Sequence, residues 1–108
     1  MKSPPRGEVW LVDLGLAAKI RPCLMVSVPV QDPERSLVSL VPHTTSSRGG
    51  RFEVEASVRF LKPGSFDAQG IVTVPLVRLV RRMGLLGPEQ LLDVEAAVGL
   101  WLGISRDA

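Results

Sequence analysis

Short apolar runs that are interrupted by Pro and Gly constrain this chain more than any other feature. Its 108 residues include nine Pro and ten Gly. These residues end strands and start turns, because Pro lacks a backbone N–H and Gly tolerates positive φ. Runs of this length that are rich in Val and Leu are typical of β-strands. The predicted strands are Arg6–Asp13, Pro22–Val28, Ser36–Pro42, Arg51–Ala56, Gly70–Val74 and Arg82–Leu86.

The apolar pattern changes period after Pro88. Pro suits the first position of a helix, and Gly103 can close that helix in the left-handed conformation. Apolar residues recur at the spacing of one helical face, which predicts that this face packs against the sheet. The residues on this face are Leu91, Val94, Val98, Trp101 and Leu102.

Short connections join the predicted elements. Leu14–Ile20 links the first two strands, which we expect to be antiparallel neighbours, and Lys62–Ser65 is a turn in which Gly64 is free to take positive φ. Pro75–Val80 is expected to contain a helical turn. The fold class that follows is mainly β with a C-terminal helix, a small, partly open β-barrel. We expect residues 1–108 to form a single domain.

The lone cysteine and the N-terminal segment bear on location. Cys23 lies within an apolar run and has no partner for an intrachain disulfide, which fits a buried side chain in a reducing cytoplasm. The first residues lack the apolar core of a signal peptide, and no run approaches the ~20 apolar residues of a membrane span. The expected location is the bacterial cytoplasm, with no membrane partner.

Charge is unevenly distributed along the chain. Residues 1–82 contain twelve Lys or Arg and seven Asp or Glu, a net charge of +5, whereas residues 83–108 contain one and four, a net charge of −3. A basic body of this kind favours a polyanion or an acidic peptide as partner.

Metal and cofactor chemistry is not expected. One Cys and one His cannot build a zinc site, and no glycine-rich phosphate loop is present. Glu53 and Glu55 share one face of an alternating strand, which we interpret as a solvated face. A nucleophilic Ser or Cys needs a base, and the only histidine is His43. If its strand continues, His43 points away from the face of Thr44, and we expect it to have a structural role.

A cation and a cluster of hydroxyls stand at the ends of two predicted strands. Arg21 precedes Pro22 at the start of an apolar run, where a charge needs either an ion-pair partner or an anionic ligand. Guanidinium and hydroxyl groups together bind phosphate oxygens, and they can stabilise charge that develops on a phosphate under attack. The hydroxyl-rich segment at the end of the third strand contains Thr44, Thr45, Ser46, Ser47 and Arg48.

Ordered blocks of residues extend along most of the chain. The blocks are Arg6-Gly7-Glu8-Val9-Trp10-x-Val12, Arg21-Pro22-x-x-x-Val26-Ser27, Val41-Pro42-x-Thr44-Thr45, Phe52-Glu53-Val54, Gly87-Pro88-Glu89-Gln90-Leu91 and Leu102-Gly103. These blocks resemble the MazF/PemK family of toxin–antitoxin endoribonucleases. The resemblance covers about residues 6–103, and the order and spacing of the blocks make it specific.

The resemblance implies an SH3-like barrel that acts as a homodimer and needs no metal or cofactor. It implies cleavage of single-stranded RNA, with mRNA expected, in which the ribose 2′-hydroxyl attacks the phosphate and leaves a 2′,3′-cyclic phosphate and a 5′-hydroxyl. Arg21 and Thr44 match the catalytic pair, and a cognate antitoxin with an acidic tail is the implied inhibitor. The other candidate RNA- or phosphate-binding residues are Lys19, Thr45, Ser46, Ser47, Arg48 and Arg78.

Two segments depart from the family pattern. The connection Leu14–Ile20 is shorter than the usual loop before Arg-Pro, and Pro75-Leu76 replaces the frequent Asp-Gln, whereas Arg78 keeps the basic position. Two alternatives therefore stay open. One is a toxin of the CcdB type that binds DNA gyrase without cutting RNA, and the other is a barrel module that binds an acidic peptide.

Overall fold

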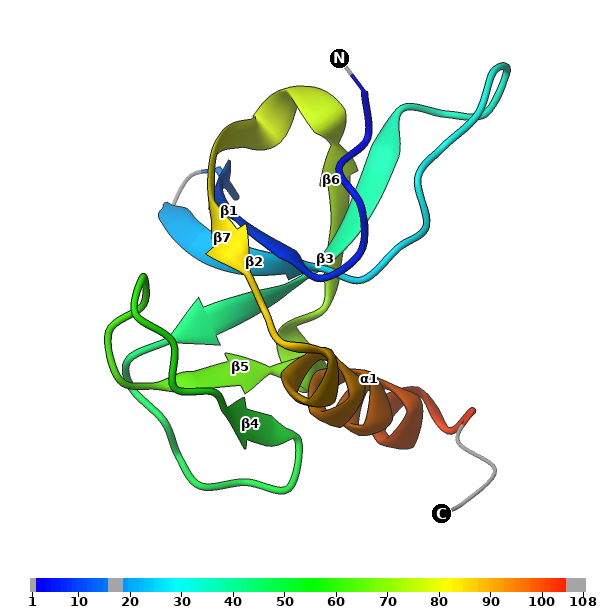
Figure 1. Ribbon diagram of the computed structural model, residues 1–108. Helices are drawn as coiled ribbons and strands as arrows, with labels where there is room; N and C mark the ends of the chain where they lie inside the picture. Colours follow the sequence, from blue (N-terminus) through cyan, green and yellow to red (C-terminus); the bar gives the residue numbers. More distant parts are fainter. Residues whose placement is uncertain (1, 16–18, 105–108) are drawn as a thin grey trace.

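The computed structural model describes residues 2–15 and 19–104. Its strands curl into a sheet that does not close, with one helix at the C-terminal end (Figure 1), which confirms the predicted fold class. The elements are β1 (Glu8–Asp13), β2 (Ile20–Met25), β3 (Leu37–Thr44), β4 (Glu53–Glu55), β5 (Ser65–Asp67), the 3-10 turn η2 (Ala68–Gly70), β6 (Val72–Pro75), the 3-10 turn η3 (Leu76–Arg78), β7 (Leu79–Leu85) and α1 (Pro88–Leu102).

The longest strand, β3, is the centre of the sheet. The strand order is β4-β5-β3-β2-β1-β7, and β6 also pairs with β3, all in antiparallel fashion. Val38, Leu40 and Val41 are buried along this strand. Both faces of β3 are covered by buried side chains, which explains its almost continuous apolar run.

Two clusters of buried side chains lie on the two faces of the sheet. The first fills the ring formed by β1, β2, β3, β6 and β7, and it includes Val12, Met25 and Leu40. The second includes Val9 and Phe66 and lies between the sheet and α1, beneath the ring in Figure 1. Because β3 contributes to both clusters, the ring and the layer of β4, β5 and α1 are joined through it.

The helix covers only part of its predicted face. Val94 is fully buried, and Leu91 and Val98 pack against the second cluster. The prediction was wrong for Trp101 and Leu102, which are 42% and 49% exposed because the last turn extends past the sheet (Figure 1).

Both ends of the helix follow from the sequence. Gly103 ends the helix with φ 70°, as predicted. At the other end, the N–H of Gly87 donates to Gln90 Oε1 at 3.0 Å, a capping contact that was not predicted. Among the described residues, no helix is long and apolar enough to cross a membrane.

The strand predictions fail mainly around residues 62–70. Ser65 begins β5, a short strand where only a turn was predicted, and η2 follows directly. Gly64 does not need positive φ there. A Cβ on it would lie 2.1 Å from the carbonyl oxygen of Thr44 and 2.8 Å from the ring of His43, so this glycine is required by a close backbone approach.

Strand boundaries also shift at β2, β6 and β7. β2 starts before Pro22 and ends at Met25, and β6 runs to Pro75. β7 starts at Leu79, directly after η3, and it pairs with β1 along most of its length. The helical turn predicted within Pro75–Val80 is present as η3.

His43 is buried at the end of β3. It is 4% exposed, and its ring packs edge-on against Phe66 with the two centroids 5.1 Å apart. Burial disfavours the charged imidazolium and lowers the pKa of His43 below its ordinary value of 6.5. The side chain is therefore neutral in the folded protein, and its place among apolar side chains agrees with the structural role that the strand alternation predicts.

This burial predicts a pH-dependent stability. Because the pKa of His43 is lower in the folded state than in the unfolded chain, its contribution is complete above about pH 6.5 and is lost as the pH falls from that value through the lower pKa of the folded state. We expect the free energy of unfolding, measured by urea denaturation over a series from neutral to mildly acidic pH, to fall less steeply in His43→Gln. Equal slopes for the two proteins would contradict the neutral, buried imidazole.

Candidate active site

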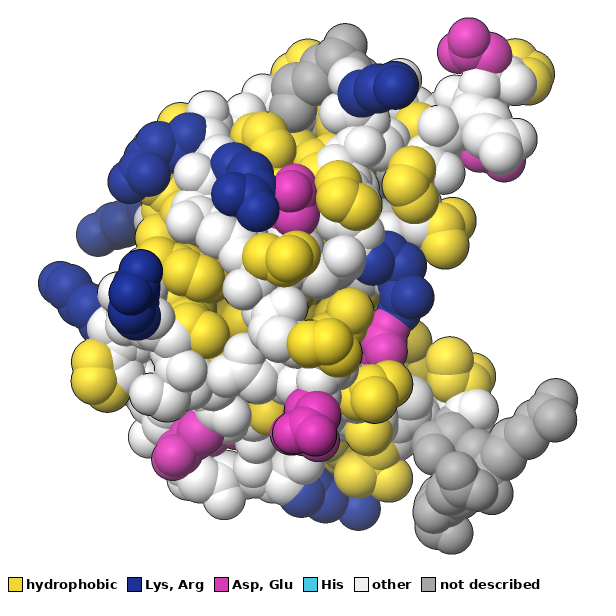
Figure 2. Space-filling view, in the orientation of Figure 1, with side chains coloured by type: hydrophobic (Ala, Val, Ile, Leu, Met, Phe, Trp, Pro, Cys, Tyr) yellow, Lys and Arg dark blue, Asp and Glu magenta, His cyan; other side chains and the backbone are white. Residues whose placement is uncertain are grey.

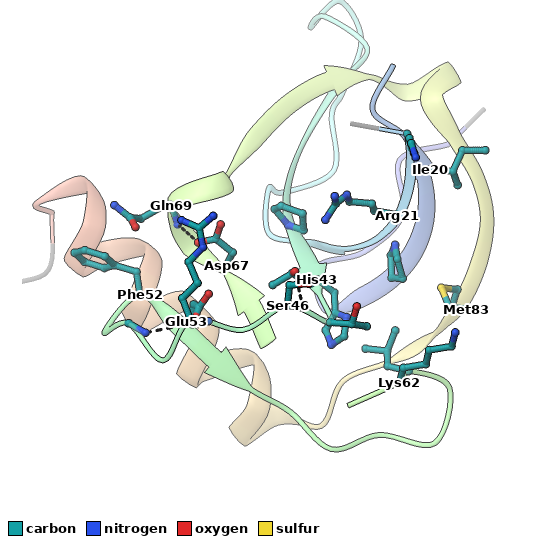
Figure 3. Close-up of a pocket in the computed structure, with 18 of the residues that line it drawn as sticks. Ile20, Arg21, His43, Ser46, Phe52, Glu53, Lys62, Asp67, Gln69 and Met83 are labelled. Atoms are coloured by element: carbon teal, nitrogen blue, oxygen red, sulfur yellow. Dashed lines mark hydrogen bonds between the residues drawn. The ribbon is translucent and has the colours of Figure 1, made fainter. Parts of the chain in front are cut away.

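A cleft of about 1030 Å³ opens where β2 begins and β3 ends. Its wall is completed by the segment that follows β3, by the loop before β5, by the start of η2 and by Met83 of β7. In Figure 3, Arg21 projects into the middle of this cleft, with Phe52, Asp67 and Gln69 on one side and Ile20, Met83 and Lys62 on the other. The cleft thus gathers side chains from segments that are far apart in the sequence.

Strand register brings Arg21 and Thr44 into this cleft. β2 and β3 are antiparallel, and Cys23 pairs with Pro42. Arg21 and Thr44 lie two residues beyond this pair on their strands, and side chains two apart on a strand point to the same face. Both residues line the cleft. The sheet therefore brings a guanidinium and a hydroxyl into the same cleft at its open end.

The hydroxyl of Thr44 is oriented by the backbone. Its Oγ1 accepts a hydrogen bond from the N–H of Ser46 at 3.0 Å. Since a hydroxyl has one hydrogen and two lone pairs, this bond leaves the O–H available to donate. Thr44 can thus offer its hydrogen to an oxygen of a bound group.

Glu53 anchors the loop between β3 and β4. Its Oε1 accepts hydrogen bonds from the backbone N–H groups of Arg48, Gly49 and Gly50 at 2.8, 2.7 and 3.3 Å. The interpretation of Glu53 as part of a solvated face was wrong, because consecutive N–H groups of a turn form a concave anion site that this carboxylate fills. Glu55, the other acid of the pair, is exposed.

The structure separates the candidate residues into two groups. One group lines the cleft and consists of Lys19, Arg21, Thr44, Thr45, Ser46 and Arg48. The other group, Ser47 and Arg78, lies outside it. The hydroxyls of Ser47 and Ser65 are 2.7 Å apart, and Arg78 Nη1 lies 3.7 Å from Asp13 Oδ2.

Lys19 reaches the cleft through a tight connection. It has φ 60°, which is uncommon for a residue with a side chain. Its N–H donates to the carbonyl oxygen of Gly15 at 3.2 Å, and its own carbonyl accepts from the N–H of Leu14 at 2.9 Å. The middle of the predicted short connection, residues 16–18, lies outside the described residues.

Sequence reasoning missed the cleft residues that precede or follow β5. Phe60, Leu61 and Lys62 come from the loop between β4 and β5, whereas Asp67 and Gln69 flank the start of η2. None of them adjoins Arg21 or Thr44 in sequence. Their proximity depends on the pairing of β5 with the end of β3, and that strand was not predicted.

Cations outnumber carboxylates along the cleft. Four cationic residues line it, Lys19, Arg21, Arg48 and Lys62, together with the two acidic residues Glu53 and Asp67. Lys and Arg also gather along the left edge of the molecule in Figure 2, over β2, β7 and the loop before β5. A basic surface of this kind attracts polyanions.

The two side chains with nucleophile or base chemistry are poorly placed for it. Burial raises the pKa of the Cys23 thiol to about 12, although the charge of Arg21 acts in the opposite direction, so the thiol is protonated at neutral pH. His43 also touches the cleft, but its Nε2 is buried and has no hydrogen-bond partner among the described residues. In residues 2–15 and 19–104, no group of three or more His, Cys, Asp or Glu is placed to hold a metal ion.

Solved structures with the same fold are toxins of toxin–antitoxin systems. An endoribonuclease in complex with its cognate antitoxin from a mycobacterial species superposes with a TM-score of 0.81, at 26% identity over 95% of this chain and 98% of that chain. The Mycobacterium tuberculosis toxin MazF-mt6 gives a TM-score of 0.77, at 27% identity over 91% and 98% of the two chains. The likeness thus extends over nearly the whole length of both proteins.

A more distant structure shows the same fold. A MazE–MazF complex from Deinococcus radiodurans gives a TM-score of 0.78, at 21% identity over 94% of this chain and 97% of that chain. The family model of PemK-like, MazF-like toxins of type II toxin–antitoxin systems matches residues 5–102. This match includes every strand, the cleft and the helix, so the chain belongs to the MazF/PemK toxin family.

Proposed function

We propose that this protein is a MazF-type endoribonuclease toxin that cleaves single-stranded RNA, with mRNA as the expected substrate, and that a cognate antitoxin neutralises it. The observation that carries the proposal is the placement of Arg21 and Thr44 in one cationic cleft. The mycobacterial endoribonuclease and MazF-mt6, which share the fold at 26% and 27% identity, support it.

The proposed reaction is a transesterification within the RNA. The 2′-oxygen of one ribose forms a bond to the adjacent phosphorus, and the bond from phosphorus to the 5′-oxygen of the next nucleotide breaks. The 2′-hydroxyl loses a proton and the departing oxygen gains one. The products are a 2′,3′-cyclic phosphate and a 5′-hydroxyl, and no metal ion takes part.

Arg21 and Thr44 have separate roles in this reaction. A guanidinium is a cation with rigid N–H donors that match phosphate oxygens, so Arg21 stabilises the negative charge that builds up on these oxygens. Thr44 donates its O–H to one of these oxygens, since its Oγ1 already accepts from the N–H of Ser46. A guanidinium can stabilise this charge without giving up a proton, and we therefore assign Arg21 an electrostatic role.

The other cleft residues bind the RNA backbone. We assign Lys19, Thr45, Ser46 and Arg48 to contacts with the reacting and neighbouring phosphates, because they line the cleft. Ser47 and Arg78 were expected to contact phosphate, but they lie outside the cleft, so we assign them an indirect role. Their partners, Ser65 and Asp13, lie beside the end of β3 and the start of the 14–19 connection.

The antitoxin binds the same basic cleft in this proposal. The carboxylates of an acidic tail pair with Lys19 and Arg21 in place of phosphate, and the tail thereby blocks the binding of RNA. The homodimer and the cytoplasmic location implied by the sequence are part of the proposal. The mycobacterial endoribonuclease and the Deinococcus MazF are each described in complex with an antitoxin.

Replacing Arg21 tests the electrostatic role. We expect Arg21→Ala to lower the cleavage rate of single-stranded RNA in EDTA by about 10²–10³-fold, because a donor aimed at the developing charge is removed. The rate is measured on denaturing gels, and 5′-hydroxyl ends are identified by direct labelling with a polynucleotide kinase. Arg35→Ala, an exposed arginine outside the cleft, is the matched control. Absence of cleavage by the unmodified protein, or equal rates for Arg21→Ala, would sink the proposal.

A pair of variants at Thr44 isolates the hydroxyl. Thr44→Val keeps the shape of the side chain and removes the donor, so we expect a loss of about 10²-fold in cleavage rate, whereas Thr44→Ser retains most of the activity. Both proteins are compared by single-turnover cleavage and by thermal unfolding. If Thr44→Ser is as slow as Thr44→Val while both remain folded, the hydroxyl has no direct role.

Expression in cells tests toxicity and neutralisation together. We expect the protein alone to arrest growth, and co-expression of its cognate antitoxin to restore growth because the acidic tail occupies the cleft. Arg21→Ala should permit growth without the antitoxin. Growth curves and a map of 5′-hydroxyl RNA ends after induction provide the readout. Unaffected growth in the absence of any partner would contradict this prediction, and gyrase inhibition without RNA ends would favour the CcdB-type alternative.

A further inference from the structure

The side of the cleft that holds Asp67 differs chemically from its centre. Phe52, Asp67 and Gln69 lie together there, across the cleft from Ile20 and Met83 (Figure 3). This side offers an aromatic ring, a carboxylate and an amide. None of these groups is assigned a part in the phosphate chemistry of Arg21 and Thr44.

The carboxylate of Asp67 has an unused oxygen. Its Oδ1 accepts a hydrogen bond from the N–H of Gln69 at 3.1 Å and so caps η2. Its Oδ2 has no hydrogen-bond partner among the described residues. A Cβ at Gly70 would lie 3.2 Å from this oxygen and 3.0 Å from the ring of Pro42. Because Gly70 has no side chain, the space beside Oδ2 stays open. The hydrogen bond at Oδ1 fixes the orientation of the carboxylate.

Phe52 provides an aromatic surface at the same side of the cleft. The guanidinium carbon of Arg51 lies 4.5 Å from the centroid of its ring, and Trp101 contacts it edge-on with centroids 5.3 Å apart. These two contacts hold the ring, which is half-buried and lines the cleft. An aromatic ring or a guanidinium plane held in this way is a typical stacking partner for an unpaired RNA base.

Charge decides which part of an RNA fits here. Glu53 and Asp67 line this side of the cleft. Glu53 is engaged by the N–H groups of Arg48, Gly49 and Gly50, so it is the carboxylate of Asp67 that disfavours a phosphate at its own position. A nucleobase is uncharged, and its edge can donate hydrogen bonds. An ionised carboxylate only accepts hydrogen bonds, and two adjacent N–H donors can meet both of its oxygens.

We propose that Asp67, together with Phe52 and Gln69, forms a base-reading site that prefers guanine over uracil in the nucleotide next to the cleaved phosphate. Guanine presents a ring N–H and an amino group side by side, which the carboxylate accepts. Uracil presents one N–H between two carbonyl oxygens, which the carboxylate repels. Phe52 stacks on the base, and the amide of Gln69 contacts its edge. This inference rests on the proposed endoribonuclease function and names the specificity determinant of the same cleft.

Asp67→Asn is the variant that tests the site. Asn caps a helical turn as well as Asp does, so the bond to the N–H of Gln69 is retained. The free oxygen is replaced by an amide NH2 group, which donates and does not accept, so the preference for adjacent N–H donors is lost. Asp32→Asn, an exposed residue in the loop between β2 and β3, is the matched control.

The experiment uses short RNAs that carry each of the four bases on either side of a single cleavage point. The unmodified protein is expected to cleave the guanine RNA at least about tenfold faster than the uracil RNA, and Asp67→Asn to reduce this ratio to within about threefold. Binding of the same RNAs to the slow Thr44→Val protein, measured by fluorescence anisotropy, should show the same order. Thermal unfolding confirms that Asp67→Asn remains folded.

The outcomes separate this inference from the proposed function. If the unmodified protein cleaves RNA but Asp67→Asn keeps the same ratio of guanine to uracil rates, the base-reading site is wrong and the endoribonuclease stands. If Arg21→Ala cleaves all RNAs as fast as the unmodified protein, the proposed function fails. In that case, the base site is still supported if anisotropy shows tighter binding of the guanine RNA and Asp67→Asn abolishes this difference. Equal binding of all four RNAs overturns the base site.

Discussion

The structure depends on the backbone pairing of β3. One edge of this strand pairs with β2 from Leu40 to Pro42, and the other edge pairs with β6 from Leu37 to Leu40 and with β5 at His43 and Thr44. Pro42, which has no N–H to donate, is the last residue of β3 that pairs with β2. Beyond it β2 and β3 are not paired, and the cleft opens there. Pairing with β2 that continued to Thr44 would close this opening.

The sides of the cleft differ in charge because different segments of the chain supply their side chains. β2 and the loop that precedes it bring Lys19 and Arg21, whereas the start of η2 brings Asp67. An RNA has anionic phosphates and uncharged bases that alternate along its length. A cleft with cations at the centre and a carboxylate at one side therefore fits a phosphate and an adjoining base at the same time. A surface with cations alone would bind RNA without distinguishing its bases.

Parts of the fold and of the site are local, and these could be predicted from sequence. The helix limits follow from Pro88 and Gly103, and the position of Arg21 beside Pro22 marks the start of β2. The short strand at Ser65 could not be predicted, because its stability comes from β3 and β4 on its two sides. The role of Glu53 was misjudged for a related reason. Alternation describes a strand, whereas the carboxylate of Glu53 accepts hydrogen bonds from the N–H groups of the preceding turn.

The sequence by itself determined the number and type of most elements, the burial of Cys23 and the family, because these depend on local propensity and on ordered motifs. Only the tertiary structure decided which polar residues share the cleft. It places Asp67 and Lys62 there and leaves Ser47 and Arg78 outside. The physical reason is that strand register and pairing set the distance between segments remote in sequence, and that information lies in the complete sheet and in no single segment.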